Sequence, residues 1–368
     1  MRVLVTGGAG FIGLATAQAL RARGDDVRIM DALTQPVHEP GAAGPGGFDF
    51  VQGDVRSKPD WIRGLDGIDA VCHLAAYQDY LKDFSTFFHV NAAGTAMLYE
   101  VIVERSLPVR RVVVASSQAV YGEGVYRCDL DGIVACEPRP AERLRRGEFE
   151  QRCPKCGGPV EPVPTPEDHA DPRTPYGISK LAQERIALAL GTTYEIPTAA
   201  MRYSIVHGAG QSPRNAYSGL LRSAALNLLA GVPPVAFEDG EQQRDYVAIG
   251  DAVSANLIAL DHPDAPGRAY NVGGDMAWTV LEVIEALREI SGRDIDSLTP
   301  GLYRVGDTRH IVSDVSRLRS LGWDARADLK AVWRDYWRWI EGLGIDPAIA
   351  WRAHQDMIER DVIRKVGA

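Results

Sequence analysis

A tyrosine and a lysine four residues apart form the first pair in this chain whose chemistry suggests a reaction. Tyr176 and Lys180 stand at the start of an expected helix whose entry is marked by Pro172 and Pro175, and this spacing puts both side chains on one helix face. Tyrosine, with a pKa of about 10, is a poor base at neutral pH, but an adjacent ammonium stabilises the phenolate and lowers that pKa. The pair can therefore act as a general base, or it can be an ordinary surface pair on an amphipathic helix.

Ser116 and Ser117 follow the apolar run 112–115, at the expected carboxyl end of a strand. Open α/β sheets bind their ligands at this end of the strands. A serine hydroxyl there can bridge a substrate oxygen and the Tyr176 hydroxyl. This arrangement raises the catalytic interpretation above the surface-pair alternative.

A glycine-rich turn predicts a dinucleotide site near the N-terminus. The turn reads TGGAGFIG over 6–13, follows the apolar run 3–5 and opens an expected helix, whose N-terminus would face a pyrophosphate. Asp31, at the end of the next apolar run, would accept hydrogen bonds from the adenosine ribose and repel a 2′-phosphate, which favours NAD over NADP. Asp54 would lie near the adenine or in a solvated loop. The alternative is a turn that merely connects a strand to a helix.

A zinc-knuckle pattern lies in the segment 124–170, which is rich in proline and cysteine. It reads Cys153-Pro-Lys-Cys156-Gly-Gly, so the turn lets both thiolates face one ion. Cys128 and Cys136 offer two further thiolates, although seven residues separate them.

Asp129 or His169 could replace either Cys128 or Cys136 as a ligand. Four protein ligands leave no open coordination position, so we expect a structural rather than a catalytic zinc, with free thiols as the alternative.

The elements that must position these groups alternate between strands and helices. Short apolar runs occupy 3–5, 27–30, 70–73, 112–115 and 198–203, with helical patterns such as 14–23 and 95–105 between them. This rhythm predicts an α/β fold with a doubly wound, Rossmann-type parallel sheet.

The same pattern predicts two domains and an insert. We expect an NAD-binding Rossmann domain over 1–200, with 124–170 as a cysteine-rich zinc insert and a return to this domain around 242–262. We expect 201–241 and 263–368 to form a smaller, mixed α/β substrate-binding domain. Its expected helices span 218–230, 280–291 and 329–343.

Composition excludes several classes of partner. The 368 residues carry 40 basic and 49 acidic side chains, a net charge of -9 without a clustered tail, which argues against nucleic acid. No run approaches roughly 18 apolar residues, so no membrane span is expected. The glycine-rich turn begins so close to Met1 that it leaves no room for a cleavable signal, and we expect a cytoplasmic protein.

The motifs together resemble the extended short-chain dehydrogenase/reductase superfamily, in its nucleotide-sugar epimerase and dehydratase branch. They are TGGAGFIG (6–13), HLAA (73–76), NAAGT (91–95), SSQAVYG (116–122), YGISK (176–180), QQRDYVAIGDAV (242–253) and YNVGG (270–274). The insert between VYG and the Tyr-x-x-x-Lys pair is a feature in which the chain resembles the branch that contains dTDP-L-rhamnose 4-epimerase.

The resemblance implies a role for each site residue. Ser117 takes the catalytic Ser/Thr position, Tyr176 is the base and Lys180 is its ribose-binding partner. The implied NAD contacts are Gly7, Gly10, Phe11, Ile12, Gly13, Asp31, Asp54, Val55, Leu74, Ala75, Ala76, Tyr176 and Lys180. The implied substrate contacts are Tyr77, Gln78, Ser117, Gln118, Asn215, Arg244 and Arg304, the two arginines at the diphosphate. Relatives commonly dimerise through two helices, here 95–105 and 176–189.

Two departures from the family pattern bear on function. Dehydratases carry an Asp-Glu pair after the catalytic Ser/Thr, whereas Gln118-Ala119 stands here, which argues against dehydration. The usual R-Y-F-N segment reads Arg-Tyr-Ser-Ile at 202–205, and the usual Pro-Arg reads Ala-Gly at 209–210, so an Asn that commonly touches the diphosphate is missing.

Two aromatic groups have both a functional and a structural interpretation. The segment 77–80, with Tyr77 and Tyr80, falls where relatives contact the sugar, but it could equally be an aromatic core cluster. In the C-terminal region, Trp333, Tyr336, Trp337 and Trp339 could form a carbohydrate platform. Their spacing of three and four is more typical of a helix core.

We therefore expect an NAD-dependent 4-epimerase of a nucleotide-diphosphate hexose, acting through a 4-keto sugar. One alternative is a nucleotide-sugar reductase or other oxidoreductase of the same family. The other is a non-catalytic, NAD-binding regulatory protein, and the intact set of Ser117, Tyr176 and Lys180 argues against it.

Overall fold

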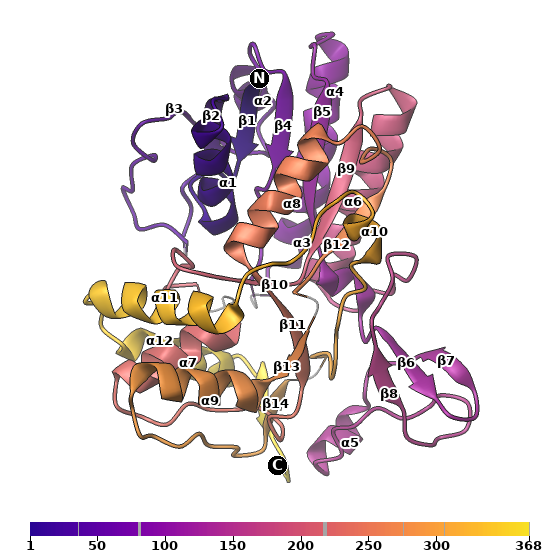
Figure 1. Cartoon of the computed structure of the whole chain (residues 1–368), viewed down its shortest axis with the longest axis vertical. Helices are drawn as coiled ribbons and strands as arrows, with labels where there is room; N and C mark the ends of the chain where they lie inside the picture. The colour runs from indigo at the N-terminus through magenta and orange to yellow at the C-terminus, as the bar shows by residue number, and fades with distance from the viewer. Residues whose placement is uncertain (36, 80–81, 216–218, 275, 305, 368) are drawn as a thin grey trace.

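A seven-stranded parallel sheet forms the centre of the computed structural model (Figure 1), which describes residues 1–35, 37–79, 82–215, 219–274, 276–304 and 306–367. Its strands are β1 (Arg2–Thr6), β2 (Asp26–Asp31), β3 (Asp49–Gln52), β4 (Ala70–His73), β5 (Arg111–Ser117), β9 (Thr198–Tyr203) and β12 (Ala269–Val272). The order β12-β9-β5-β4-β1-β2-β3 reverses direction between β1 and β4, the point at which such sheets bind ligands. All six pairings are parallel, which confirms the expected doubly wound α/β fold.

Helices cover both faces of this sheet, so the strands are apolar on both sides. On β1, Val3 and Val5 pack into one core and Leu4 packs into the core on the opposite face. The first face carries α1 (Phe11–Ala22), α8 (Ile249–Asp261) and the short α10 (Ser316–Arg319). The second carries α2 (Lys58–Gly64), α4 (Gly94–Glu104) and α6 (Pro175–Thr193).

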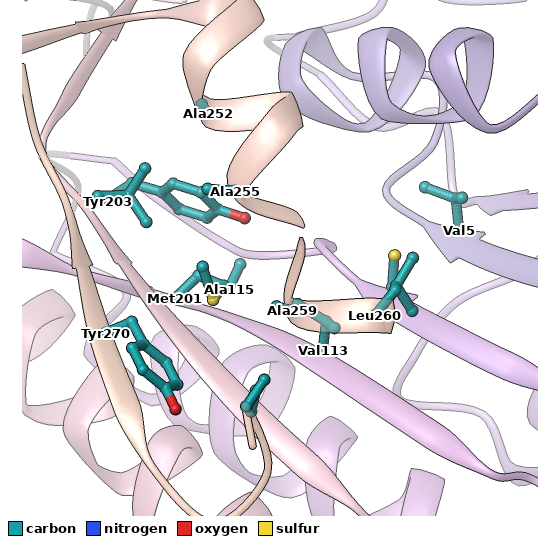
Figure 2. Close-up of a cluster of buried hydrophobic side chains, with 14 of the residues drawn as sticks. Val5, Val113, Ala115, Met201, Tyr203, Ala252, Ala255, Ala259, Leu260 and Tyr270 are labelled. Carbon is teal, nitrogen blue, oxygen red and sulfur yellow. The ribbon is translucent and has the colours of Figure 1, made fainter. Parts of the chain in front are cut away.

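Small side chains bring α8 close to the sheet. Figure 2 shows Ala252, Ala255 and Ala259 beside strand residues such as Met201 and Val113. Alanine at these helical spacings lets a helix backbone approach the strands, and this leaves room for larger side chains such as Tyr203 in the same core.

A second layer packs below the large sheet in Figure 1. It contains a three-stranded sheet of β10 (Ile205–His207), β11 (Gln243–Ala248) and β13 (Ala277–Thr279). Its helices are α7 (Gly219–Leu229), α9 (Val280–Ser291), α11 (Leu329–Gly342) and α12 (Ala348–Glu359), with the strand pair β14 (Leu302–Arg304) and β15 (Ile363–Lys365).

Residues 124–170 form a structure of their own, which projects to one side (Figure 1). A small antiparallel sheet contains β6 (Val125–Cys128), β7 (Gly132–Ala135) and β8 (Glu161–Val163). The short helix α5 (Ala141–Arg145) lies between β7 and β8 in the chain. Its core is small and contains Tyr126, Val134 and three of the cysteines. Three further short helical segments span Phe84–Phe87 (α3), Phe88–Ala93 and Gln118–Tyr121.

The structure corrects the expected boundaries of the two domains. β12 lies in the segment 263–368, which the sequence assigns to the second domain, yet it pairs with β9 at the edge of the large sheet. The segment 242–262 is divided, because β11 belongs to the small sheet and only α8 returns to the large one. Both β3 and β12 are only four residues long, and such short runs carry little periodicity of their own.

Most of the C-terminal aromatic residues belong to a core, as their spacing predicts. Trp333, Tyr336 and Trp337 are buried on α11 and pack with α7 and α9. Trp339 is only partly buried and lines the main cavity. Within the described ranges, no helix combines the length and the apolar character that crossing a membrane requires.

Candidate active site

A cavity of about 1460 Å³ opens at the carboxyl ends of the central strands and extends to the second layer. Every residue that the sequence predicts for NAD, substrate or catalysis lines it, whereas the cysteines of the insert do not. Tyr80, in the segment expected near the sugar, falls outside the described residues.

The glycine-rich turn between β1 and α1 leaves no space for side chains. Gly7 has a φ of +65°, and a Cβ there would lie 2.7 Å from the backbone nitrogen of Ala75. At Gly13 a Cβ would lie 2.1 Å from the carbonyl oxygen of Gly7. Gly10, the N-cap of α1, makes no side-chain cap, so the amides of the first turn remain available to an anion at the cavity wall.

Asp31 is held at the end of β2 by backbone amides. Its two carboxylate oxygens accept hydrogen bonds from the N–H groups of Ala9, at 3.0 Å, and Leu33, at 2.9 Å. The carboxylate therefore lies over the glycine turn. Both carboxylate oxygens of Asp54 instead accept hydrogen bonds from the Arg56 guanidinium, and these bonds lower the pKa of Asp54.

Tyr176 and Lys180 occupy one face of α6 and are both buried. The helix starts with Pro175 after the Thr174 cap, whose Oγ1 accepts the Gly177 N–H at 3.1 Å. Burial raises the pKa of Tyr176 to about 12, although a hydrogen bond with Ser117 opposes this. Burial also lowers the pKa of Lys180 to about 7. Desolvation, rather than an adjacent ammonium, therefore has the largest effect on the pKa of the Tyr176 hydroxyl.

The two serines at the end of β5 point to opposite sides. Ser117 bonds to Tyr176 and accepts the Ala119 N–H at 3.1 Å, so it faces the cavity. Ser116 donates to the Oε2 atom of Glu184 at 2.8 Å. Because side chains alternate along a strand, the Ser117 hydroxyl lies beside Tyr176 and the Ser116 hydroxyl lies on the other side of the strand.

A buried ion pair lies directly behind this site. Glu184 accepts two hydrogen bonds from the Arg202 guanidinium, at 2.8 and 2.6 Å, and both side chains are only 4% exposed. Arg202 also donates to the Tyr121 hydroxyl and to the carbonyl oxygens of Glu167 and His169. The pair therefore joins α6, β9, the turn after β5 and the end of the insert.

Asn91, for which the sequence predicts no role, lies behind the cavity wall and supports Tyr77. Its Oδ1 accepts the Tyr77 N–H at 2.8 Å, and its Nδ2 donates to the Tyr77 carbonyl at 3.1 Å and to Ser179 Oγ at 2.9 Å. It fixes the Tyr77 backbone to the helix of Tyr176. The NAAGT motif marks this position, but only the fold brings Asn91 beside a segment 88 residues away.

Tyr77 is part of an aromatic cluster, which is one of the two interpretations that the sequence leaves open. Its ring packs against Phe87 with centroids 5.0 Å apart, and Phe87 in turn contacts Tyr176. The Tyr77 hydroxyl donates to Asp83 at 2.7 Å. Tyr77 thus belongs to an aromatic cluster that also forms a wall of the cavity.

Charged and polar side chains line the opposite end of the cavity. Arg244 donates to the carbonyl oxygens of Gln243, Thr308 and Arg309, which fix its guanidinium. Arg304 lies over the Phe237 ring, 4.6 Å from its centroid. Nearer to Ser117, the Oε1 atom of Gln118 is buried and accepts no hydrogen bond among the described residues.

Three of the four cysteines that the sequence predicts as zinc ligands form a compact group with an aspartate. Cys128, Cys153 and Cys156 lie with Asp131, and the four ligand atoms are within 4.8 Å of one another. Cys136 is outside this group, and its sulfur donates to the Arg152 carbonyl at 3.6 Å. The two expected substitutes, Asp129 and His169, are outside it as well.

The spacing of Asp131 from Cys128 explains its position in this group. Cys128-x-x-Asp131 repeats the two-residue spacing of Cys153-x-x-Cys156, so two similar turns face each other. The Cys128 sulfur lies 3.5 Å from the Cys156 sulfur and 3.7 Å from Asp131 Oδ2. Tetrahedral zinc with Zn–S bonds of about 2.3 Å places neighbouring sulfurs about 3.8 Å apart. The group therefore has the dimensions of a zinc site.

A model of the NAD dependent epimerase/dehydratase family matches residues 3–139 and 154–273. The chain is 31% identical to dTDP-L-rhamnose 4-epimerase of Burkholderia thailandensis over 353 residues, covering 92% of this chain and 94% of that protein. It is 28% identical to UDP-glucose 4-epimerase of Lacticaseibacillus casei, covering 93% of this chain and 97% of that protein.

Solved structures give the same similarity. UDP-glucose 4-epimerase from Thermotoga maritima, with UDP-glucose, superposes with a TM-score of 0.75 at 25% identity, covering 93% and 99% of the two chains. UDP-glucose 4-epimerase from Thermus thermophilus, in complex with NAD, superposes with a TM-score of 0.70 at 29% identity, covering 92% and 99%.

Replacing Glu184 by Gln should destabilise the protein, because the amide keeps the shape but leaves the buried Arg202 guanidinium without a counter-charge. Removing one partner of a buried ion pair costs about 3–5 kcal/mol. Denaturant unfolding measures this free energy. Glu285→Gln, which breaks an exposed pair with Arg288 on α9, is the matched control and should change little. Equal stability of Glu184→Gln and wild type would show that the buried pair does not support the fold.

Proposed function

The chain belongs to the NAD dependent epimerase/dehydratase family and is an NAD-dependent nucleotide-sugar epimerase, and we propose that it inverts C4 of its sugar with Tyr176, Lys180 and Ser117. The observation that carries this assignment is the hydrogen bond between Ser117 and Tyr176 inside a cavity that is also lined by the glycine turn and by Arg244 and Arg304. A sugar C4–OH placed at this hydrogen bond would lie between the cofactor cradle and a diphosphate site.

The glycine turn fits NAD on steric and electrostatic grounds. The missing Cβ atoms at Gly7 and Gly13 leave the backbone exposed beside the uncapped start of α1, where a pyrophosphate would bind. Asp31, held by two amides, keeps carboxylate lone pairs for the ribose hydroxyls. NAD bound there would accept a hydride from C4 and return it to the same carbon.

Tyr176 acts as the base that takes the proton from the sugar 4-hydroxyl. Because burial raises its pKa to about 12, the hydroxyl is protonated at neutral pH unless positive charge is brought beside it. Lys180, one helical turn away, holds the ribose and adds positive charge when it is protonated. Ser117 bonds the substrate oxygen and keeps it in line with the Tyr176 hydroxyl.

The sugar and the diphosphate occupy the remainder of the cavity. Gln118 offers a buried amide oxygen without a partner among the described residues, which suits a sugar hydroxyl as donor. Tyr77, Gln78 and Asn215 contact the sugar or its phosphates from the cavity wall. Arg244 and Arg304 bind the diphosphate, and the Phe237 ring under Arg304 holds that guanidinium in place.

The insert binds one structural zinc ion through Cys128, Asp131, Cys153 and Cys156. Four protein ligands would complete a tetrahedron, and the ion would order a segment whose own core is small. The ion therefore has no part in the reaction at Tyr176.

The chain forms a homodimer through α4 and α6. Ile178, on the first turns of α6, is 44% exposed, and Phe84 and Phe88 are exposed on the segment that packs against it. Burial of these apolar side chains between two copies would place each catalytic helix at the dimer interface.

The Tyr176→Phe variant deletes the phenolic oxygen and keeps the ring, so we expect turnover to fall by roughly 100-fold to 10,000-fold while NAD binding is retained. Product formation by NMR and cofactor fluorescence measure the two effects. Tyr194→Phe, at the exposed end of the same helix, is the control and should keep full activity. Turnover near that of the wild type in Tyr176→Phe would move the chemistry to another residue.

A substrate deuterated at C4 should keep its label in the product, because epimerisation returns the hydride to the carbon from which it came. We also expect turnover without stoichiometric NAD or NADH. Mass spectrometry of product and cofactor, over a panel of UDP-, dTDP-, GDP- and CDP-hexoses, checks this. Deuterium in released cofactor, or NADH that accumulates with product, would instead establish the oxidoreductase alternative.

Elemental analysis of the purified chain should find about one zinc per chain. Cys153→Ser and Asp131→Asn should lower the zinc content and make the insert sensitive to limited proteolysis. Cys136→Ser should retain the ion, because this thiol lies outside the ligand group. A zinc-free chain with a protease-resistant insert would contradict the zinc site.

A further inference from the structure

One arginine at the cavity is buried, and the described residues give it no counter-charge. Arg222, on α7, is 2% exposed and lines the same cavity as Arg244 and Arg304. Its Nε donates to the Pro213 carbonyl oxygen at 2.5 Å. Its Nη2 atom is fully buried, and no hydrogen-bond acceptor for it exists among the described residues.

The other deeply buried arginines show how unusual this is. Arg202 pairs with Glu184, Arg139 pairs with Glu238, and Arg309 pairs with Glu238 and Asp239. For Arg222, by contrast, the described parts of the chain supply no carboxylate within ion-pair distance. Burial lowers its pKa to about 10, and the Tyr336 hydroxyl opposes this shift.

A buried guanidinium remains charged at neutral pH even at this lowered pKa, so it needs an anion. Its Nη2 atom is a spare donor, and a second atom of the same fork is already oriented by Pro213. Two other residues of the cavity wall, Ile205 and Gly210, have no hydrogen-bond donor in their side chains, so their side chains cannot bind the anion in place of Arg222. A phosphate group suits the planar fork, because it accepts two parallel hydrogen bonds.

We propose that Arg222 is a third diphosphate-binding arginine, which completes the site of Arg244 and Arg304 and selects a sugar carried on two phosphates. The inference rests on the proposed function and deepens it. Without ligand, the charge of Arg222 is a source of instability. With a nucleoside diphosphate bound, the same charge is neutralised and holds α7 to the ligand.

Binding of nucleoside diphosphates tests this assignment. UDP, dTDP, GDP and CDP are titrated into wild type by calorimetry, and the tightest of them is compared with its parent nucleoside. Arg222→Met keeps the apolar stem without the charge, and should weaken diphosphate binding at least 10-fold while nucleoside binding is unchanged. Arg222→Lys should restore part of the affinity, since it keeps the charge without the fork. Arg288→Met, on the exposed face of α9, should change neither affinity.

Thermal unfolding of the same proteins separates a ligand role from a structural one. The melting temperature of ligand-free Arg222→Met should equal or exceed that of wild type, because an uncompensated buried charge is removed. Unchanged diphosphate affinity in Arg222→Met, with or without a lower melting temperature, would overturn the inference and leave Arg222 as a support for Pro213. Failure of wild type to bind any of the four nucleoside diphosphates would overturn the proposed function itself.

Discussion

The buried ion pair between Glu184 and Arg202 is the interaction on which the site depends. Glu184 lies two helical turns beyond Tyr176 on α6, and it accepts hydrogen bonds from Arg202 on β9 and Ser116 on β5. The pair thus fixes α6, the helix of Tyr176, against the two strands whose carboxyl ends line the cavity. In a low-dielectric interior, this geometry is strict, because any displacement would leave a charge unpaired.

The same low dielectric sets the chemistry in front of the pair. Desolvation raises the pKa of Tyr176 and lowers that of Lys180, so both groups favour their neutral forms. Charge brought in by bound molecules then has a large effect on them, since little water screens it. Arg222 faces the same situation at the other end of the cavity, where a buried cation lacks a carboxylate among the described residues.

Hydrogen bonds, ion pairs and a small apolar cluster of Leu144, Phe149 and Tyr303 connect the insert to both regions. Arg202 donates to the carbonyl oxygens of Glu167 and His169 at the end of the insert. Arg309, beside the cavity residue Thr308, pairs with Glu150 of the insert and with Asp239 of the second layer. A zinc ion at the cysteine group would therefore order a segment that contacts both Arg202, the partner of Glu184 on α6, and the second layer.

The sequence by itself determined the features that depend on local spacing. The apolar runs predicted the parallel sheet, the glycine turn predicted the dinucleotide cradle, and the family resemblance is confirmed by the family match. Only the tertiary structure decided that Ser116, next to Ser117, bonds Glu184 behind the site, that Asp131 rather than Cys136 lies with the other cysteines, and that Arg222 is buried at the cavity. The first outcome depends on the pleating of β5 and the second on two distant turns that come together. The third depends on how α7 packs beside the cavity. Such contacts join residues far apart in the chain, so a local pattern of residue types does not contain them.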